Sequence, residues 1–271
     1  MSDDSLDDVV VLEHQGDVSV VRFNRPDRMN ALSSAGWLVF EQRMLEADAE
    51  PTTGAIVVTG TGRAFCAAGD VSSMAAKQEP AAAEARRRAP ARRVRHDGLG
   101  LVNTMLEIEK PTVAALNGAA VGIGATVALL CDQVLMARSA RIGDSHVPLG
   151  IVAGDGAIAV LPLLIGVHRA KELLLTGRLI DGDEAAAIGL VSDTVELSEL
   201  EPFALARAQD LATRPTYATR ATKQAINRVL RANAELLLET AFAYEELSMG
   251  LPEHREALAR FLEPKGLSAP S

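Results

Sequence analysis

The stretch Ala114–Thr126 could stabilise an oxygen that carries negative charge. It begins as an apolar run, typical of a buried strand, and passes through Gly122 and Gly124 into a second apolar run that predicts a helix. A helix N-terminus presents N–H groups without intrahelical partners and a partial positive charge, so the amides near Ile123 and Gly124 are candidate donors. A close-packed strand-to-helix turn without a ligand fits the same pattern. A dinucleotide loop is disfavoured, because Val127 stands where that fingerprint has Gly or Ala.

A second turn of small residues follows another apolar strand. Residues 55–60 predict a buried strand, which leads into Thr61–Asp70 with its glycines Gly62 and Gly69. Two such turns, about fifty residues apart, could each direct one N–H at the same oxygen. That arrangement is an oxyanion hole, and its loss typically costs about 3 to 4 kcal/mol of transition-state stabilisation.

Few nucleophilic or metal-binding patterns accompany these turns. No histidine pair has metal-ligand spacing and no Cys-x-x-Cys occurs, so we expect no metal site. No Gly-x-Ser-x-Gly elbow supports a serine nucleophile. Cys66 abuts the second turn without an assignable histidine partner, which favours a small apolar filler over a nucleophile. Asp155, between two glycines, is either a helix N-cap or a functional carboxylate.

Residues 77–98 are rich in alanine and arginine. One interpretation is a solvated helix or lid. The other is that some of the arginines contact ligand phosphates, because a guanidinium pairs bidentately with phosphate. The two interpretations are compatible.

Apolar periodicity predicts a mixed α/β body followed by helices alone. We expect a hairpin and strands at 9–13, 18–23, 55–58, 112–116, 133–137, 141–142 and 191–195. We expect helices within the body from an N-cap at Ser34 and at 99–108, 125–131, 156–164, 168–175 and 183–188. The tail predicts helices at 198–213, 216–231, 234–249 and 253–262. The expected division is therefore 1–197 and 198–271, and no internal repeat is visible.

Composition excludes several function classes. The 271 residues are 48% hydrophobic and 23% charged, which is ordinary for a globular chain. A net charge of −9 and 3% aromatic residues argue against nucleic-acid binding, which depends on phosphate neutralisation and stacking. The acidic N-terminus lacks a signal-peptide pattern, no apolar run approaches the roughly 18 residues of a membrane span, and two cysteines make no disulfide framework. We therefore expect a cytoplasmic protein.

Seven segments, in this order, resemble the crotonase superfamily, that is, the enoyl-CoA hydratase/isomerase family. The match covers nearly the whole chain, which makes the combination far more specific than any one motif. The segments are Asn24–Pro26, Asn30–Leu32, Ala64–Asp70, Pro111–Gly118, Cys131–Asp132, Gly150–Val152 and Ala170–Gly177.

The resemblance implies a crotonase-like (ClpP/crotonase) spiral of β-β-α units with a C-terminal helical trimerisation region. It implies a homotrimer or a dimer of trimers, and an acyl-CoA thioester substrate with no cofactor beyond that coenzyme A. The thioester oxygen would lie between the N–H groups of Gly69 and Ile123. The residues that the resemblance places along the coenzyme A path are Arg25, Asp27, Arg28, Arg63, Ala67, Ala68 and Asp70.

The chain departs from the family pattern at several positions. Ala68 and Ile123 stand where family members usually have Gly, although the Ile123 N–H is retained. Hydratases of the family use two glutamates, and those positions hold Thr126 and His146. A threonine hydroxyl cannot act as a base near pH 7, whereas a histidine can. Asp155, one residue past a position where some members have a catalytic carboxylate, is the second acid/base candidate, and Asp144 is the third.

These observations predict an acyl-CoA enzyme that stabilises a thioester enolate, with proton transfer by His146 or Asp155. The missing glutamates leave double-bond isomerisation or decarboxylation open beside hydration, because the oxyanion hole supplies more of the transition-state stabilisation than the acid/base groups do. A non-catalytic acyl-CoA-binding protein is the alternative of another class.

Overall fold

The structure, a computed structural model, describes residues 6–67 and 91–263, with the side chains of 91–98 left aside. In this part of the chain the strands form two sheets. The larger has the order β1 (Val10–Gln15), β2 (Val18–Phe23), β3 (Ala55–Gly60), β5 (Thr112–Leu116), β7 (Gln133–Ala137) and β10 (Asp193–Val195). The smaller has the order β4 (Ala64–Ala67), β6 (Ala119–Val121), β8 (Arg141–Gly143) and β9 (Ile180–Asp181).

The chain builds both sheets together by repeating one unit. β3, β5 and β7 enter the larger sheet, and each is followed directly by a strand of the smaller sheet, β4, β6 or β8. β3, β5 and β7 pair in parallel with one another, and so do β4, β6 and β8. β1 is antiparallel to β2, and β9 is antiparallel to β8. Every residue of β3 and β5 is buried, which explains why these strands are continuous apolar runs and not alternating ones.

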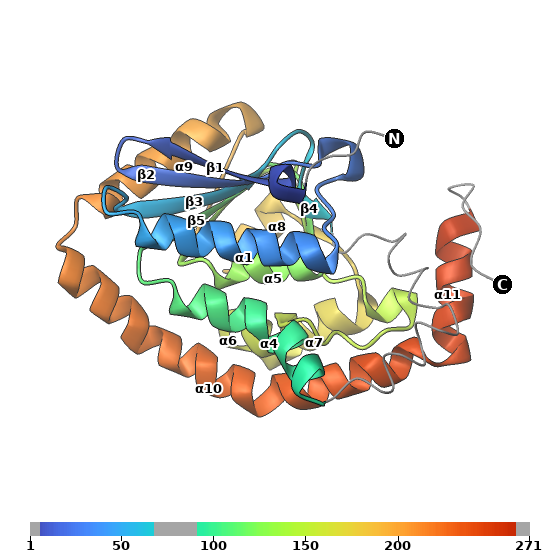
Figure 1. The fold of residues 1–271 in the computed structure, drawn as a ribbon. Coiled ribbons are helices and arrows are strands. Elements are labelled where there is room, and N and C mark those ends of the chain that lie inside the picture. The colour runs from blue at the N-terminus through green and yellow to red at the C-terminus, as the bar shows by residue number, and fades with distance from the viewer. Residues whose placement is uncertain (1–5, 68–90, 264–271) are drawn as a thin grey trace.

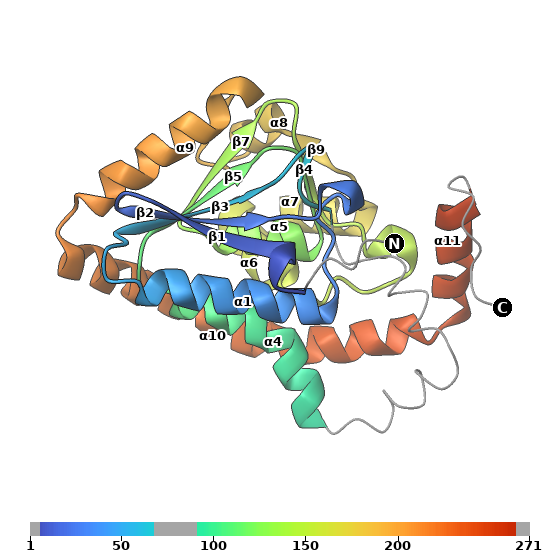
Figure 2. The ribbon, with the colours of Figure 1, turned by 45° about the horizontal axis from the view of Figure 1, so that its top comes forward.

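Helices cover the sheets on both sides (Figures 1 and 2). α9 (Leu197–Ala212) packs on β3, β5 and β7, and α1 (Ser34–Ala49) packs on β1 and β2. Trp37 of α1 is buried against Phe23, with the ring centroids 5.8 Å apart, as expected for a core residue. The remaining body helices are α4 (Ala91–Glu107), α5 (Ile123–Leu130), α6 (Ala157–Ile165), α7 (Val167–Thr176) and α8 (Gly182–Ala187), with 3-10 turns η1 (Leu6–Val9), η2 (Pro26–Arg28) and η3 (Val147–Leu149).

The C-terminal helices brace the body from outside. α10 (Thr216–Met249) runs along the edge of the molecule against α4 and α6, and α11 (Pro252–Leu262) contacts η3. Lys223 of α10 reaches the body, where its Nζ pairs with Asp132 at 2.8 Å and donates to the Lys110 carbonyl at 2.7 Å. No helix within residues 6–67 and 91–263 is long and apolar enough to cross a membrane.

Three expectations about helices were wrong in detail. The break expected between residues 231 and 234 does not exist, since α10 is continuous over 34 residues. Packing against α4 and α6 supports its middle, and Asn233 donates to the Ala159 carbonyl. α4 begins at Ala91, eight residues before the expected start. Ser33, not Ser34, caps α1, because its hydroxyl accepts from the Gly36 N–H.

Candidate functional site

Three parallel strands of the smaller sheet end side by side. Ala67 of β4 pairs with Val121 of β6, and Val121 pairs with Gly143 of β8. Because parallel strands share one carboxyl edge, the segments that follow them leave the sheet as neighbours. They lead to residues 68 onward, to Ile123 and to the segment Asp144–His146. The ends of β4 and β6 are therefore neighbours, with the end of β8 beside them.

Ile123 begins helix α5 at this edge. Gly122, with φ +56°, precedes it and donates its N–H to the Gly143 carbonyl at 3.0 Å. As the first residue of the helix, Ile123 has no carbonyl one turn back to accept its N–H within α5. Gly124 packs so closely on the Cys66 carbonyl of β4 that a Cβ there would overlap it. The first turn of α5 is therefore held against both neighbouring strands.

The second predicted donor lies outside the described residues. Gly69, Ala68 and Asp70 follow β4 directly, but the description of that strand ends at Ala67. The contribution of Gly69 to an oxyanion hole stays a prediction. The pairing of Ala67 with Val121 supports it, since it starts the segment of Gly69 beside the segment of Ile123.

Asp144 fixes the imidazole of His146. Both carboxylate oxygens of Asp144 lie 2.9 Å from His146 Nδ1, and one also accepts the His146 backbone N–H at 2.9 Å. The Asp144 side chain is only 2% exposed. These contacts assign the Nδ1 proton to the bond with Asp144 and leave Nε2 to face the interior of the site.

Asp155 lies opposite the free edge of that imidazole. Its Oδ2 is 3.7 Å from His146 Nε2, and the Thr126 hydroxyl donates to its Oδ1 at 3.4 Å. Thr126 lies one turn along α5 from Ile123 and is fully buried. The N-cap position of α6 is Gly156 at φ +115° and not Asp155, but the Asp155 carboxylate still accepts from the backbone N–H of Ala157, the first residue of that helix. Asp144, His146, Asp155 and Thr126 thus form one row of contacts beside the start of α5.

Burial and mutual charge shift the pKa values of this row. Burial acts to lower the pKa of His146, but the carboxylates of Asp155 and Asp144 outweigh it and raise the pKa from 6.5 to about 10. Burial raises the pKa of Asp155 to about 6, although the charge of His146 opposes the rise. At neutral pH His146 is therefore an imidazolium. Asp155 titrates close to neutrality, which favours it over His146 as the base.

The same three side chains have the spacing of a metal site. Ligand atoms of Asp144, His146 and Asp155 all lie within 4.8 Å of one another. At neutral pH, however, a metal ion would have to displace the proton that the neighbouring carboxylates hold on His146, whose pKa they raise to about 10. The donor set fits proton transfer better than metal binding. The spacing of histidines in the sequence could not indicate this grouping, because Asp155 comes from a different loop.

The raised pKa of His146 predicts a pH-dependent stability. A histidine whose pKa lies higher in the folded chain contributes stability that is complete below about pH 6.5 and is lost as pH rises through about 10. Over that window the contribution falls by about 1.4 kcal/mol per pH unit. We expect the gap in free energy of unfolding between the wild type and His146→Asn, measured with urea, to narrow between pH 7 and pH 10. A difference in free energy of unfolding that stays constant between pH 7 and pH 10 would contradict this prediction.

The predicted coenzyme A contacts lie on two neighbouring turns. Pro26 lies against Gly62, so the 25–28 turn and the turn before Arg63 are adjacent. The Arg25 guanidinium donates to the Ala31 carbonyl at 2.7 Å, whereas Asp27, Arg28 and Arg63 are exposed. The Ala67 N–H donates to the Met29 carbonyl at 3.0 Å, which ties the first turn to the end of β4. The structure thus brings Arg25, Asp27, Arg28, Arg63 and Ala67 to one region.

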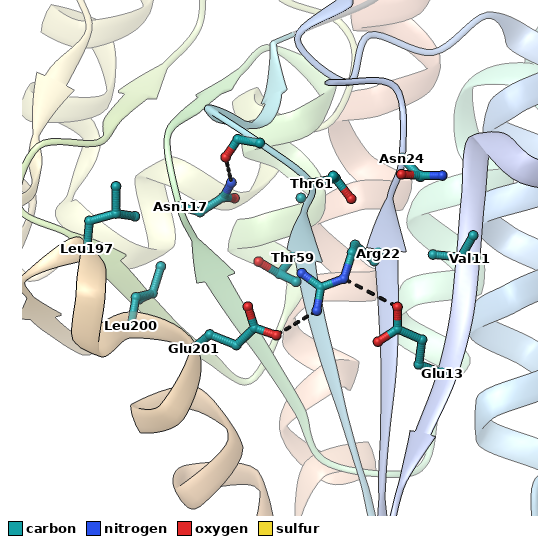
Figure 3. Close-up of a pocket in the computed structure, with 12 residues that line it drawn as sticks. Val11, Glu13, Arg22, Asn24, Thr59, Thr61, Asn117, Leu197, Leu200 and Glu201 are labelled. Atoms are coloured by element: carbon teal, nitrogen blue, oxygen red, sulfur yellow. Dashed lines mark hydrogen bonds and ion pairs between the residues drawn. The ribbon is translucent and has the colours of Figure 1, made fainter. Parts of the chain in front are cut away.

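A separate pocket of about 770 Å³ lies over the larger sheet, between β1, β2, β3 and α9 (Figure 3). Arg22 occupies its middle, where it pairs with Glu201 at 2.6 Å and with Glu13 at 3.7 Å. None of the predicted site residues lines it. Its charged side chains are paired with one another, and it holds no titratable row comparable to that of Asp144, His146 and Asp155.

Sequence reasoning missed one charged residue beside the site. Glu245 of α10 packs against Gly154, next to Asp155. Ala241, Glu245 and Ser248 are spaced four and three residues apart, so they share one face of the helix. An acidic residue flanked at helical spacing by an alanine and a serine, on a helix face that packs against the body, is the sequence pattern that could have indicated Glu245.

Comparisons with known proteins place the chain in one family. The family model for enoyl-CoA hydratase/isomerase matches residues 13–266. A short-chain-enoyl-CoA hydratase of Clostridium acetobutylicum is 33% identical over 94% of this chain and 95% of that protein. The crystal structure of an enoyl-CoA hydratase/isomerase from Mycobacterium paratuberculosis has a TM-score of 0.83 at 30% identity, covering 93% of this chain and 98% of that one.

A monofunctional enoyl-CoA isomerase from M. smegmatis has a TM-score of 0.68 at 26% identity, covering 83% of this chain and 94% of that one. These matches confirm the fold class that the sequence predicted. The chain belongs to the enoyl-CoA hydratase/isomerase family of the crotonase superfamily.

Proposed function

We propose that this acyl-CoA enzyme removes and returns a proton next to the thioester carbonyl, with Asp155 as the group that carries the proton. One observation supports the proposal above all: the row of Asp144, His146, Asp155 and Thr126 lies beside the N-terminus of α5, where Ile123 offers its N–H. A proton acceptor and an oxyanion donor beside the first turns of one short helix are the two groups that enolate chemistry needs.

The proposed reaction moves one proton through an enolate. The Asp155 carboxylate takes the proton from the carbon next to the thioester, and the electron pair of that C–H bond moves into the carbonyl, which becomes an enolate oxygen. The N–H groups of Ile123 and Gly69 stabilise that oxygen. Asp155 then returns the proton to the same carbon or, when a neighbouring double bond is conjugated, to the carbon at its far end. The second outcome moves the double bond along the chain.

Isomerisation fits this chain better than hydration. Hydration needs an added water to be oriented and deprotonated, which the family's hydratases do with two glutamates, and here Thr126 and His146 hold those positions. His146 is charged at neutral pH and cannot accept the water's proton. A single carboxylate that titrates near neutrality suffices for moving one proton.

The substrate is proposed to carry coenzyme A along the region of Arg25, Asp27, Arg28 and Arg63. The exposed arginines suit the phosphates, since guanidinium groups pair well with them. A homotrimer or dimer of trimers is the proposed assembly. Exposed apolar side chains along α10 support it, among them Ile226, Val229, Leu236 and Leu247.

Solvent exchange tests the proposal. In deuterium oxide, we expect the purified chain to exchange the α-protons of a saturated acyl-CoA such as butyryl-CoA, and to isomerise 3-enoyl-CoA substrates, as followed by proton NMR. The double variant His146→Ala/Asp155→Ala is expected to lose the exchange and keep coenzyme A binding in calorimetry. Wild-type binding without exchange or turnover across a panel of acyl chain lengths would instead make the chain a non-catalytic acyl-CoA-binding protein.

A further inference from the structure

The C-terminal helices hold the loop that carries Asp155. The Val152 N–H donates to the Ser248 hydroxyl of α10 at 3.0 Å, and His254 Nδ1 of α11 lies 2.7 Å from the Leu149 carbonyl. Beyond the Val152 contact, α10 approaches the loop so closely that a Cβ on Gly154 would overlap the Glu245 carboxylate. The loop between His146 and Asp155 is thus pinned at three points from the C-terminal side.

Glu245 brings a third carboxylate to the cluster. Its Oε2 atom is buried, and its negative charge acts on His146 in the same direction as the charges of Asp155 and Asp144. Each of the three comes from a different segment: Asp144 from the end of β8, Asp155 from the loop before α6, and Glu245 from α10. His146 is therefore one cation among three acids.

On the neighbouring helices α4, α5, α6, α7 and α11, within the described residues, the other charged side chains are exposed or directed elsewhere. α5 and α6 contain no charged residue. The charged side chains of α7, which packs on η3, are exposed, as are Glu107 of α4 and Glu253 of α11. His254 of α11 directs its Nδ1 at the Leu149 carbonyl. Glu246, the neighbour of Glu245 in sequence, is exposed.

We infer that Glu245 is a positioning residue of the acid/base cluster, through which the C-terminal helix α10 places a carboxylate against the loop of Asp155 and stabilises the imidazolium form of His146. The inference deepens the proposed function, because the cluster transfers protons only if that function holds. It also gives α10 a role in the chemistry beyond packing, since a carboxylate on this helix adds negative charge to a site built by the body.

A histidine titration tests the inference without any substrate. The ring resonance of His146 in the full-length protein, assigned by its absence in His146→Asn, reports the midpoint at which the imidazolium loses its proton. We expect Glu245→Gln to lower that midpoint, by less than removal of the Asp155 charge would, because Glu245 is the weakest of the three negative charges that act on His146. Glu246→Gln, the matched surface control, is expected to leave it unchanged. Glu245→Asp, which keeps the charge on a shorter side chain, should give an intermediate midpoint.

The outcomes distinguish the inference about Glu245 from the proposed function of the enzyme. A lowered midpoint in Glu245→Gln or, should that variant fail to fold, in Glu245→Asp supports the inference, whether or not the enzyme exchanges α-protons. A midpoint equal to that of Glu246→Gln in a folded Glu245 variant overturns it, even if the wild type is active. For an active enzyme we also expect Glu245→Gln to move the alkaline fall of kcat to lower pH, with KM at neutral pH within about twofold, since the residue acts through His146 and does not touch substrate.

Discussion

Ile123→Pro is expected to lower kcat for α-proton exchange or isomerisation by about 10² to 10³-fold. Proline removes one N–H and nothing else from the proposed oxyanion hole. Ile123 is the first residue of α5, and the first helical position tolerates proline because its N–H has no partner within the helix. The helix should therefore survive while the donor is lost. Steady-state kinetics with the acyl-CoA identified by the exchange experiment would measure the effect.

Ile123→Ala is the matched control for that variant. It shortens the side chain as proline does but keeps the N–H, so we expect its kcat to stay within about tenfold of the wild type. Circular dichroism and the midpoint of urea unfolding check that α5 remains in place in both proteins. Equal kcat values for the proline and alanine variants would exclude this amide as an oxyanion donor, whatever Gly69 contributes.

The buried strands and the turns that follow them could be predicted from the sequence because both depend on local patterns. Continuous apolar runs such as Ala55–Gly60 mark strands buried on both faces, and glycine turns mark their ends. The resemblance to the family then supplied the expected architecture, a spiral of β-β-α units, but not the order of the strands in the sheets. The repeated unit itself was invisible in sequence, because each copy keeps only a burial pattern and not particular residues.

The geometry of the acid/base cluster could not be predicted in the same way. Asp155 preceding a helix looks like a cap in sequence, and only the packing of its loop against Thr126 shows that its carboxylate is directed into the site. His146 was expected near its ordinary pKa, and two buried carboxylates from different segments shift it to about 10. The direction of the Asp155 carboxylate and the pKa of His146 both depend on contacts between separate segments, which cannot be read from a single sequence.

Asp155→Asn is the variant expected to be most damaging to proton transfer. The amide keeps the size of the side chain and its contact with the Thr126 hydroxyl but cannot accept the substrate's proton. Loss of a general base typically costs 10² to 10⁴ in rate, so we expect kcat to fall about 10³-fold with little change in KM. In the wild type, kcat should rise as pH passes through about 6, where Asp155 ionises, and the residual activity of Asp155→Asn should lack that rise.

The titration of His146 is a second readout, which distinguishes loss of the base from a structural change in the site. Removing the Asp155 charge also removes the largest force that raises the pKa of His146, so the imidazolium of Asp155→Asn should lose its proton at a lower pH than in the wild type. Asp183→Asn, at an exposed aspartate on α8, is the control and should change neither property. A large loss of kcat with an unmoved His146 titration would contradict the assignment of His146 and Asp155 as one coupled pair. An unchanged kcat and pH profile would remove Asp155 from the mechanism and leave only the main-chain donors beside it.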